Sequence, residues 1–245
     1  MVDELVIKTF KKADIYVSRV LEDEDLRHVD VIKVQKRIKD AVKYATKTWE
    51  MDVMAMGVGL ENQHDGMRDA VRSARNKDIL VFAPASNMGN LTGIAFPARL
   101  HHDALCMFSM DARAKISHSL NPQPSRHRRY NLALFGEQVQ LHEDGTLLSG
   151  TSISTAIAAG LAAHLLDFSR HVDSREILMR DEEALRTMEG MESVFVRMSR
   201  GGSDDGYYCV APWSLLEGID TDLDRKSRRS GLCHANKAAV RDRNY

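Results

Sequence analysis

The sequence predicts an α/β fold built on a mostly parallel sheet with helices on both faces. Short apolar runs rich in β-branched and aromatic residues alternate with segments whose apolar residues recur at helical spacing. Successive strands lie about 30 residues apart, which leaves room for one crossover helix between parallel neighbours. The chain has 245 residues and 43% of them are hydrophobic, so a sizeable core can form.

The first half of the chain carries three predicted strands and two predicted helices after a short opening helix that includes Leu5 and Phe10. Strands are expected at 13–20, 51–58 and 78–85, and helices from Val31 to Trp49 and over 66–76. The run DILVFAPA at 78–85 is the strongest strand prediction, because it is apolar throughout and short.

The second half begins with predicted strands at 104–109 and 131–135. The helix that follows, from Gly150 to Phe168, is apolar nearly all round, with small residues in its first half, so it should be buried on most sides. Another helix is expected over 175–200. We therefore expect three parts: a sheet domain over 1–168, a helical extension over 169–216 and a polar, disordered tail over 217–245.

Composition narrows the functional classes. The net charge of -1 gives no support for a nucleic-acid partner, and no apolar run reaches the ~18 residues of a membrane span. The opening residues lack the pattern of a signal peptide, and the three cysteines, Cys106, Cys209 and Cys233, are widely spaced, so a cytoplasmic location is expected. No phosphate-binding loop, metal-ligand spacing or cofactor motif is present in the sequence, so no cofactor is expected.

Gly150, Thr151 and Ser152 open the apolar helix. A hydroxyl group there meets unpaired backbone N–H groups and the positive end of the helix dipole. One interpretation makes Thr151 or Ser152 a helix cap, which is common. The other makes the serine a nucleophile, and the run of small residues on the buried face of the helix adds weight to it.

Asn87 follows the strongest predicted strand. Ligand sites on parallel sheets gather beyond the carboxyl ends of strands, where an asparagine amide can donate to a developing oxyanion. The alternative is an asparagine that only turns the chain after the strand.

Together these segments resemble the subtilases, the subtilisin-like serine peptidases, in consistent order over residues 5–168. SGTSISTAIAAGLAA at 149–163 resembles the nucleophile helix, DILVFAPASN at 78–87 the oxyanion strand and MDVMAMGVG at 51–59 the substrate-binding strand. IAFPAR at 94–99 is similar to the segment that follows the oxyanion asparagine. The resemblance implies a serine endopeptidase acting on peptide or protein substrates.

The resemblance also implies a role for particular residues. Ser152 is the implied nucleophile and Asn87 the implied oxyanion donor. Gly57, Val58 and Gly59 are implied to hold an extended substrate as an added strand through backbone hydrogen bonds.

Two parts of the subtilase pattern are missing from this sequence. A subtilase uses a histidine to take the serine proton and an aspartate to orient that histidine. The helix LVIKTF matches the helix that normally begins with the histidine motif, but the motif itself would precede Met1, and neither His28 nor His64 matches it. The aspartate strand, which the family places inside the sheet, is absent too. We therefore expect two strands to lack a neighbour, and the chain alone to be poorly folded and inactive.

Two other classes of function remain open on the sequence. The chain could be a peptidase relic or pseudoenzyme that binds peptides without cleaving them. A small-molecule enzyme on a doubly wound sheet is the third class, and no matching ligand-binding loop supports it.

Overall fold

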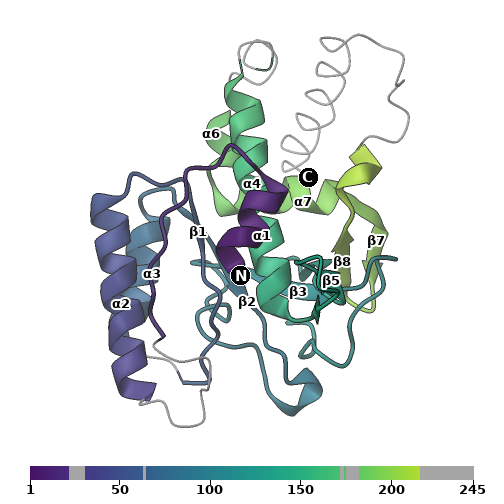
Figure 1. Cartoon of the computed structure of the whole chain (residues 1–245), viewed down its shortest axis with the longest axis horizontal. Helices are drawn as coiled ribbons and strands as arrows, with labels where there is room; N and C mark the ends of the chain where they lie inside the picture. Colours follow the sequence, from purple (N-terminus) through teal and green to yellow (C-terminus); the bar gives the residue numbers. More distant parts are fainter. Residues whose placement is uncertain (22–30, 63–64, 172–173, 175–181, 216–245) are drawn as a thin grey trace.

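The structure is a computed structural model, and it describes residues 1–21, 31–62, 65–171, 174 and 182–215. Its centre is a six-stranded sheet in the order β1-β2-β3-β4-β8-β7 (Figure 1). All neighbours in it are parallel except β7 and β8. The strands are β1 Val53–Ala55, β2 Leu80–Pro84, β3 Leu105–Met110, β4 Leu132–Phe135, β7 Ser199–Asp204 and β8 Tyr207–Val210.

Helices cover the sheet as two layers, and each layer encloses its own hydrophobic core. One core holds α1 (Val2–Thr9), α4 (Thr151–Arg170), α6 (Glu182–Leu185) and α7 (Met188–Arg197). The other holds α2 (Val31–Thr48) and α3 (Asp65–Arg75). Short 3-10 helices η2 and η3 lie at Gly89–Leu91 and Pro212–Leu215, and a small hairpin joins β5 (Val139–Gln140) to β6 (Leu147–Leu148).

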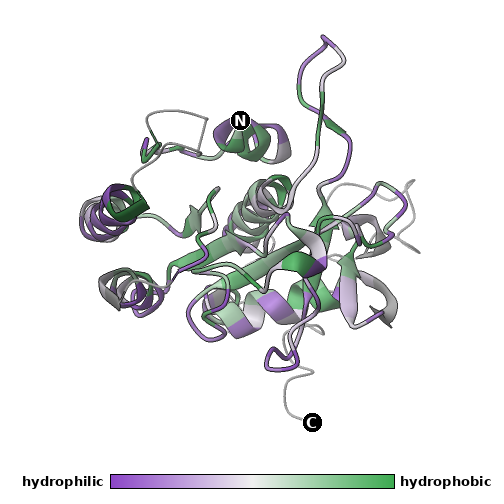
Figure 2. Ribbon diagram, turned by 90° about the horizontal axis from the view of Figure 1, so that it is seen from below, coloured by the Kyte–Doolittle hydropathy of each residue, from purple (hydrophilic) through white to green (hydrophobic). Residues whose placement is uncertain are grey.

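Strand β2 shows how the sheet separates the two cores. Leu80 and Phe82 point into the core under α4, whereas Val81 and Ala83 point into the core under α2 and α3. This is the period of two that a strand requires, and all four side chains are buried. Figure 2 shows the result, with hydrophobic strands at the centre and helices that turn hydrophilic sides outward.

Helix α4 is the central helix of its layer. It contacts β1, β2, β3 and β4 and packs along α1. Among the described residues it is also the one helix long and apolar enough to cross a membrane by length and composition, although 56% of that stretch is buried inside the protein. Its apolar character is therefore explained by packing on the sheet.

The α/β fold class with helices on both faces is confirmed, and most predicted elements lie where the sequence places them. The prediction of a strand at 13–20 is wrong: these residues form no helix, turn or bridge and are mostly exposed. β1 pairs with β2 on one side, and its outer edge has no paired strand among the described residues. Residues 14–18, across a groove from this edge, make no backbone hydrogen bond to other described segments, so two segments lack a neighbour, as expected.

The region after α4 differs most from the prediction. One helix was expected over 175–200, and the structure has two shorter ones there, Glu182–Leu185 and Met188–Arg197. Residues 175–181 lie outside the described residues. The residues after it, expected to lie in a helical extension, form β7 and β8, and β8 pairs with β4 in the main sheet. The predicted tail from 217 lies outside the described residues.

Phe195 tests whether the region after α4 belongs to the same cooperative unit. Its ring is fully buried and lies 6.1 Å from the ring of Phe82 on β2, centroid to centroid. We expect Phe195→Ala to lower the free energy of unfolding by about 3–5 kcal/mol, because it removes a large side chain from a packed core. Urea unfolding, followed by far-UV circular dichroism, should show one transition shifted to lower urea.

Leu91→Ala is the matched control, since the Leu91 side chain is 85% exposed. It should change the free energy of unfolding by less than about 0.5 kcal/mol. A Phe195→Ala protein that instead unfolds in two separate steps, with the main transition unmoved, would show that α7 and β8 form an independent unit.

Candidate functional site

Asn87 lies in a loop after β2 that several hydrogen bonds hold in place. The Ser86 hydroxyl accepts a hydrogen bond from the Met88 N–H at 3.2 Å and lies 3.1 Å from the Thr92 hydroxyl. The Gly89 N–H donates to the Leu120 carbonyl at 2.9 Å. Gly89 has φ +56°, and a Cβ there would lie 3.0 Å from a neighbouring carbonyl oxygen, so the turn requires glycine. The loop therefore holds Asn87 in a fixed place.

The Asn87 side chain binds the first residue of helix α4. Its Oδ1 accepts hydrogen bonds from the Thr151 N–H at 2.7 Å and from the Thr151 hydroxyl at 3.0 Å. The N-cap position is Gly150, which has no side chain to cap the helix. The interpretation of Thr151 or Ser152 as the cap is thus wrong, because they are the first two helical residues. The Thr151 N–H, which has no partner within the helix, is instead satisfied by Asn87, 64 residues away in the sequence.

Ser152 is the second residue of α4 and carries a free backbone donor. The Ile153 and Ser154 N–H groups donate to the Gly150 carbonyl at 3.0 and 3.4 Å, and the Thr151 N–H donates to Asn87. Within the described residues, the Ser152 N–H and the Asn87 Nδ2 have no hydrogen-bond partner. Two donors at the positive end of a helix dipole are therefore left unsatisfied.

The Asn87 amide and the Ser152 hydroxyl face the same small space beside Gly150. A Cβ built on Gly150 would lie 3.0 Å from Asn87 Nδ2 and 3.4 Å from Ser152 Oγ. Asn87 is exposed and Ser152 is half-buried, so this space is open to solvent. The structure thus brings together the two residues that the sequence singled out, and glycine at 150 keeps the space between them empty.

Polar and small residues behind the site fix the position of α4 on the sheet. The Ser154 hydroxyl donates to the Leu134 carbonyl at 3.0 Å, and the Gly150 N–H donates to the Gly136 carbonyl at 2.8 Å. A Cβ on Gly136 would overlap Ser154 Oγ and would lie 2.9 Å from Ser109 Oγ. Sequence analysis missed Gly136, although an isolated glycine at a strand end signals a close backbone approach.

Gly57, Val58 and Gly59 follow β1 at the same edge of the sheet as Asn87, because β1 and β2 are parallel. A Cβ on Gly57 would lie 2.8 Å from Val2 Cγ2, and one on Gly59 would lie 2.8 Å from Ala95 Cβ. A side chain at either position would therefore displace a neighbouring side chain.

No histidine forms a hydrogen bond with Ser152 in the described part of the chain. His28 and His64 lie outside the described residues. Burial raises the pKa of the Cys106 thiol to about 11, so this buried residue of β3 is an inert thiol and no rival nucleophile. The described residues also hold no group of three or more side chains able to bind a metal ion.

Comparison with known proteins shows which proteins the chain resembles. No protein-family model matches it. It is similar to the subtilisin-like protease het-Q2 of Podospora anserina, with 24% identity over an alignment of 261 residues, gaps included. The alignment covers 96% of this chain and 69% of the relative. The chain therefore resembles the subtilisin-like serine proteases, as its sequence motifs indicated.

Solved protease structures share its fold. The prenylagaramide maturation protease PagA matches with a TM-score of 0.57 and 16% identity, covering 86% of this chain and 71% of that protein. A cold-adapted subtilisin-like serine proteinase matches with a TM-score of 0.54 and 19% identity, covering 73% and 60%. The relative and the shared fold thus confirm the resemblance to the subtilases that the sequence motifs indicated.

Gly136→Ala tests the close approach that positions α4. We expect it to lower the free energy of unfolding by about 1–3 kcal/mol, because the added methyl group overlaps the Ser154 hydroxyl in a packed site. Thermal unfolding would measure the loss, and Gly136→Ala combined with Ser154→Ala should recover part of it. Glycine-to-alanine at Gly93, where a Cβ meets nothing within 4 Å, is the matched control. Equal effects at both glycines would contradict this account of the site.

Proposed function

We propose that the chain carries the nucleophile and the oxyanion site of a serine endopeptidase. Ser152 Oγ attacks the carbonyl carbon of a peptide bond, and the oxyanion is held by Asn87 Nδ2 and the Ser152 N–H. One observation carries the proposal. Because Asn87 Oδ1 is engaged by Thr151, its Nδ2 is the group left facing the space next to Ser152 Oγ.

The substrate strand is proposed to be 57–59. An extended peptide can pair with an exposed backbone edge, so that main-chain hydrogen bonds provide affinity. The position of the segment supports this, because it follows β1 at the same sheet edge as Asn87.

We propose further that this chain's own residues provide no general base for Ser152. The support is the missing histidine motif in the sequence, together with the lack of a histidine bound to Ser152 in the described residues. Hydroxide or water must then take the serine proton. An oxyanion site and substrate binding alone leave roughly 10³–10⁴-fold catalysis over water, far below a working protease.

Labelling with a fluorophosphonate tests the nucleophile and the missing base together. We expect slow modification of Ser152 at neutral pH, abolished in Ser152→Ala. Its rate should rise about tenfold per pH unit from pH 6 to 9, because the reactive alkoxide grows with hydroxide concentration. Mass spectrometry of tryptic peptides would locate the adduct. A fast rate that levels off above pH ~7, where a histidine base is neutral, would contradict the missing base.

Asn87→Asp separates the oxyanion donor from the helix cap. Aspartate keeps the oxygen that accepts from Thr151 and places negative charge at a helix N-terminus, so stability should be retained. It removes the Nδ2 donor, so the labelling rate at Ser152 should fall ~10²–10³-fold, the usual loss for one oxyanion donor.

Asn90→Asp, the same change at an exposed residue of the same loop, is the control and should leave the rate within a factor of two to three. Equal labelling of the Asn87→Asp and Asn90→Asp proteins would overturn the oxyanion role. If Ser152 is not labelled at any pH although the protein is folded, the non-catalytic alternative, a peptide-binding pseudoenzyme, replaces the proposal.

A further inference from the structure

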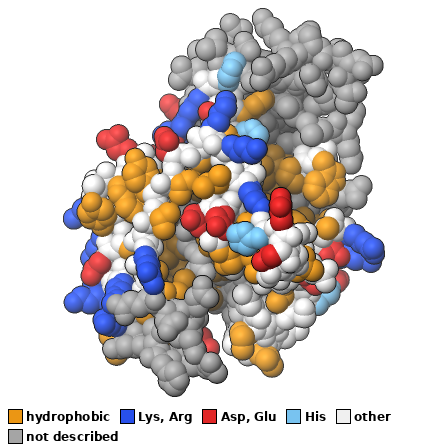
Figure 3. Space-filling model, in the orientation of Figure 1, with side chains coloured by type: hydrophobic (Ala, Val, Ile, Leu, Met, Phe, Trp, Pro, Cys, Tyr) orange, Lys and Arg blue, Asp and Glu red, His pale blue; other side chains and the backbone are white. Residues whose placement is uncertain are grey.

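Helix α2 concentrates positive charge in a chain that is nearly neutral overall. It holds six basic residues and one acidic residue, so the helix carries +5, whereas the whole chain has a net charge of -1. It lies beside α3 at one side of the molecule (Figure 1, Figure 2). Figure 3 shows basic side chains along that side. Such a local separation of charge indicates a surface that meets an anionic partner.

Three of the lysines lie in a row on the outer face of α2. Lys36, Lys43 and Lys47 follow one another at intervals of seven and four residues, which places them on one helix face over about 16 Å. All three are exposed, and none forms an ion pair within the described residues. Asp40 lies on the same face, but Lys39 Nζ is 3.6 Å from its carboxylate. The row therefore keeps its positive charge.

The row continues past the end of α2. Lys77, in the turn after α3, donates from Nζ to the Thr46 carbonyl at 3.0 Å and so lies beside the last turn of α2. A carbonyl group is neutral, so it leaves the charge of Lys77 uncompensated. Arg72 and Arg75 near the end of α3 differ, because each pairs with a carboxylate, at 3.4 and 3.8 Å. The three lysines of α2 and Lys77 are called the lysine row below.

One exposed apolar side chain extends the same face. Ile32 precedes Lys36 by four residues, so the two share a helix face, and the isoleucine is 75% exposed. At a lipid surface such a side chain can enter the boundary between headgroups and acyl chains. Lysines beside it can keep their charged ends at the level of the headgroups.

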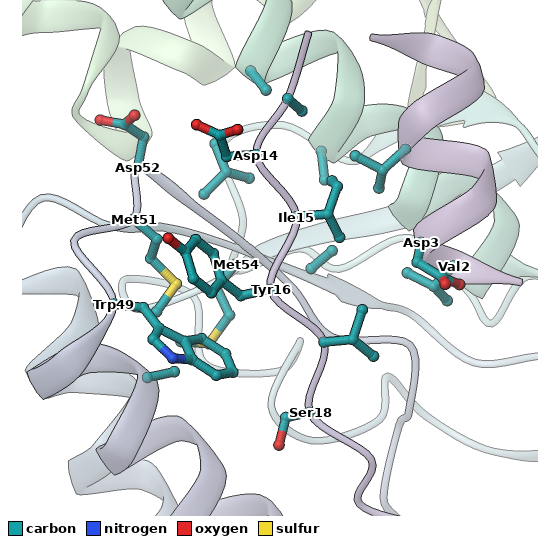
Figure 4. Close-up of a pocket in the computed structure, with 18 of the residues that line it drawn as sticks. Val2, Asp3, Asp14, Ile15, Tyr16, Ser18, Trp49, Met51, Asp52 and Met54 are labelled. Atoms are coloured by element: carbon teal, nitrogen blue, oxygen red, sulfur yellow. The ribbon is translucent and has the colours of Figure 1, made fainter. Parts of the chain in front are cut away.

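The side of α2 next to the segment 13–18 is occupied by aromatic rings. Trp49, just after the helix, stacks on Tyr16 with 5.2 Å between ring centroids (Figure 4). Tyr44 meets Trp49 edge-on, with 5.8 Å between ring centroids. These rings contact one another, so the face with the lysine row is the one that α2 offers to a partner.

We propose that the lysine row docks the protein on a membrane surface that carries anionic lipids. Lysines are point charges on flexible stems, which suit phosphate headgroups, and the outer face of a straight helix can lie flat on a bilayer. Each lysine close to such a surface contributes roughly fivefold in affinity. The isoleucine favours lipid over a nucleic acid, because a phosphate backbone has no use for Ile32.

Docking by this face leaves the Ser152 site open. Helix α2 ends at Thr48, shortly before β1 begins, and so lies toward the amino edge of the sheet. Asn87 and Ser152 lie at the carboxyl edge, beyond the end of β2. The proposal therefore concerns where the protein acts and does not depend on catalysis.

Vesicle co-sedimentation tests the proposal. The probes are unilamellar vesicles of phosphatidylcholine with about 30% phosphatidylserine, and vesicles of phosphatidylcholine alone. The protein is the full chain. We expect it to bind the anionic vesicles only, and to bind them at least tenfold more weakly at ~0.5 M salt than at ~0.05 M salt, because salt screens exposed charges.

Two variants locate the surface. Lys43→Gln combined with Lys47→Gln should weaken vesicle binding roughly 25-fold, since two lysines are lost. Ile32→Ser should weaken it at least about threefold, because less apolar surface enters the lipid. Arg113→Gln combined with Lys115→Gln removes the same charge from exposed residues of the loop after β3 and should change binding less than about twofold. Circular dichroism would show that all variants are folded.

Other occupants of the lysine row would give different results. Equal affinity of the two double variants, or no vesicle binding by the folded chain, would overturn the proposal. Tighter binding to oligouridylate than to vesicles, lost with Lys43 and Lys47 but unchanged in Ile32→Ser, would overturn it in favour of a nucleic acid. Vesicle binding that appears only when the four acidic residues at 22–25 are changed to the matching amides would identify that acidic run as the occupant instead.

Discussion

The hydrogen bond from the Thr151 N–H to Asn87 Oδ1 is the interaction on which the site depends. It satisfies the first orphan N–H of α4 with a side chain from the loop after β2, and so fixes the helix start to the carboxyl edge of the sheet. It also fixes which way the amide faces. With Oδ1 engaged, Nδ2 must point to the space beside Ser152 Oγ. The cap of α4 and the proposed oxyanion geometry therefore follow from one contact.

That contact needs α4 to lie unusually close to its neighbours, and small residues make this possible. Gly136 lets the helix start approach the end of β4, and a Cβ on Gly160 would lie 2.7 Å from Thr9 Cβ on α1. A side chain at either glycine would push α4 outward and move Ser152 with it. The run of small residues in the sequence is thus the cause of the geometry, because packing at this distance leaves no room for larger groups.

The sequence predicted the parts of the fold that local pattern controls. The alternation in β2 and the small apolar face of α4 each follow from residues within one segment. The prediction at 13–20 failed because strand formation depends on a paired neighbour, which its β-branched residues cannot provide. GGSDDG at 201–206 lies in a hairpin that joins the sheet, although glycine and aspartate are depleted in strands. The cap of α4 was missed because its donor and acceptor lie 64 residues apart.

The outer edge of β1 and the proposed substrate strand form one continuous region. Val2 of α1 lines the groove along this edge and also lies beside Gly57, at the start of the proposed substrate strand. Gly57 and Val58 themselves line the groove. Because packed interiors transmit small displacements rather than absorb them, the packing along the edge of β1 bears on how firmly 57–59 is held. The backbone proposed to pair with a substrate is therefore positioned partly by α1, far from Ser152 in the sequence.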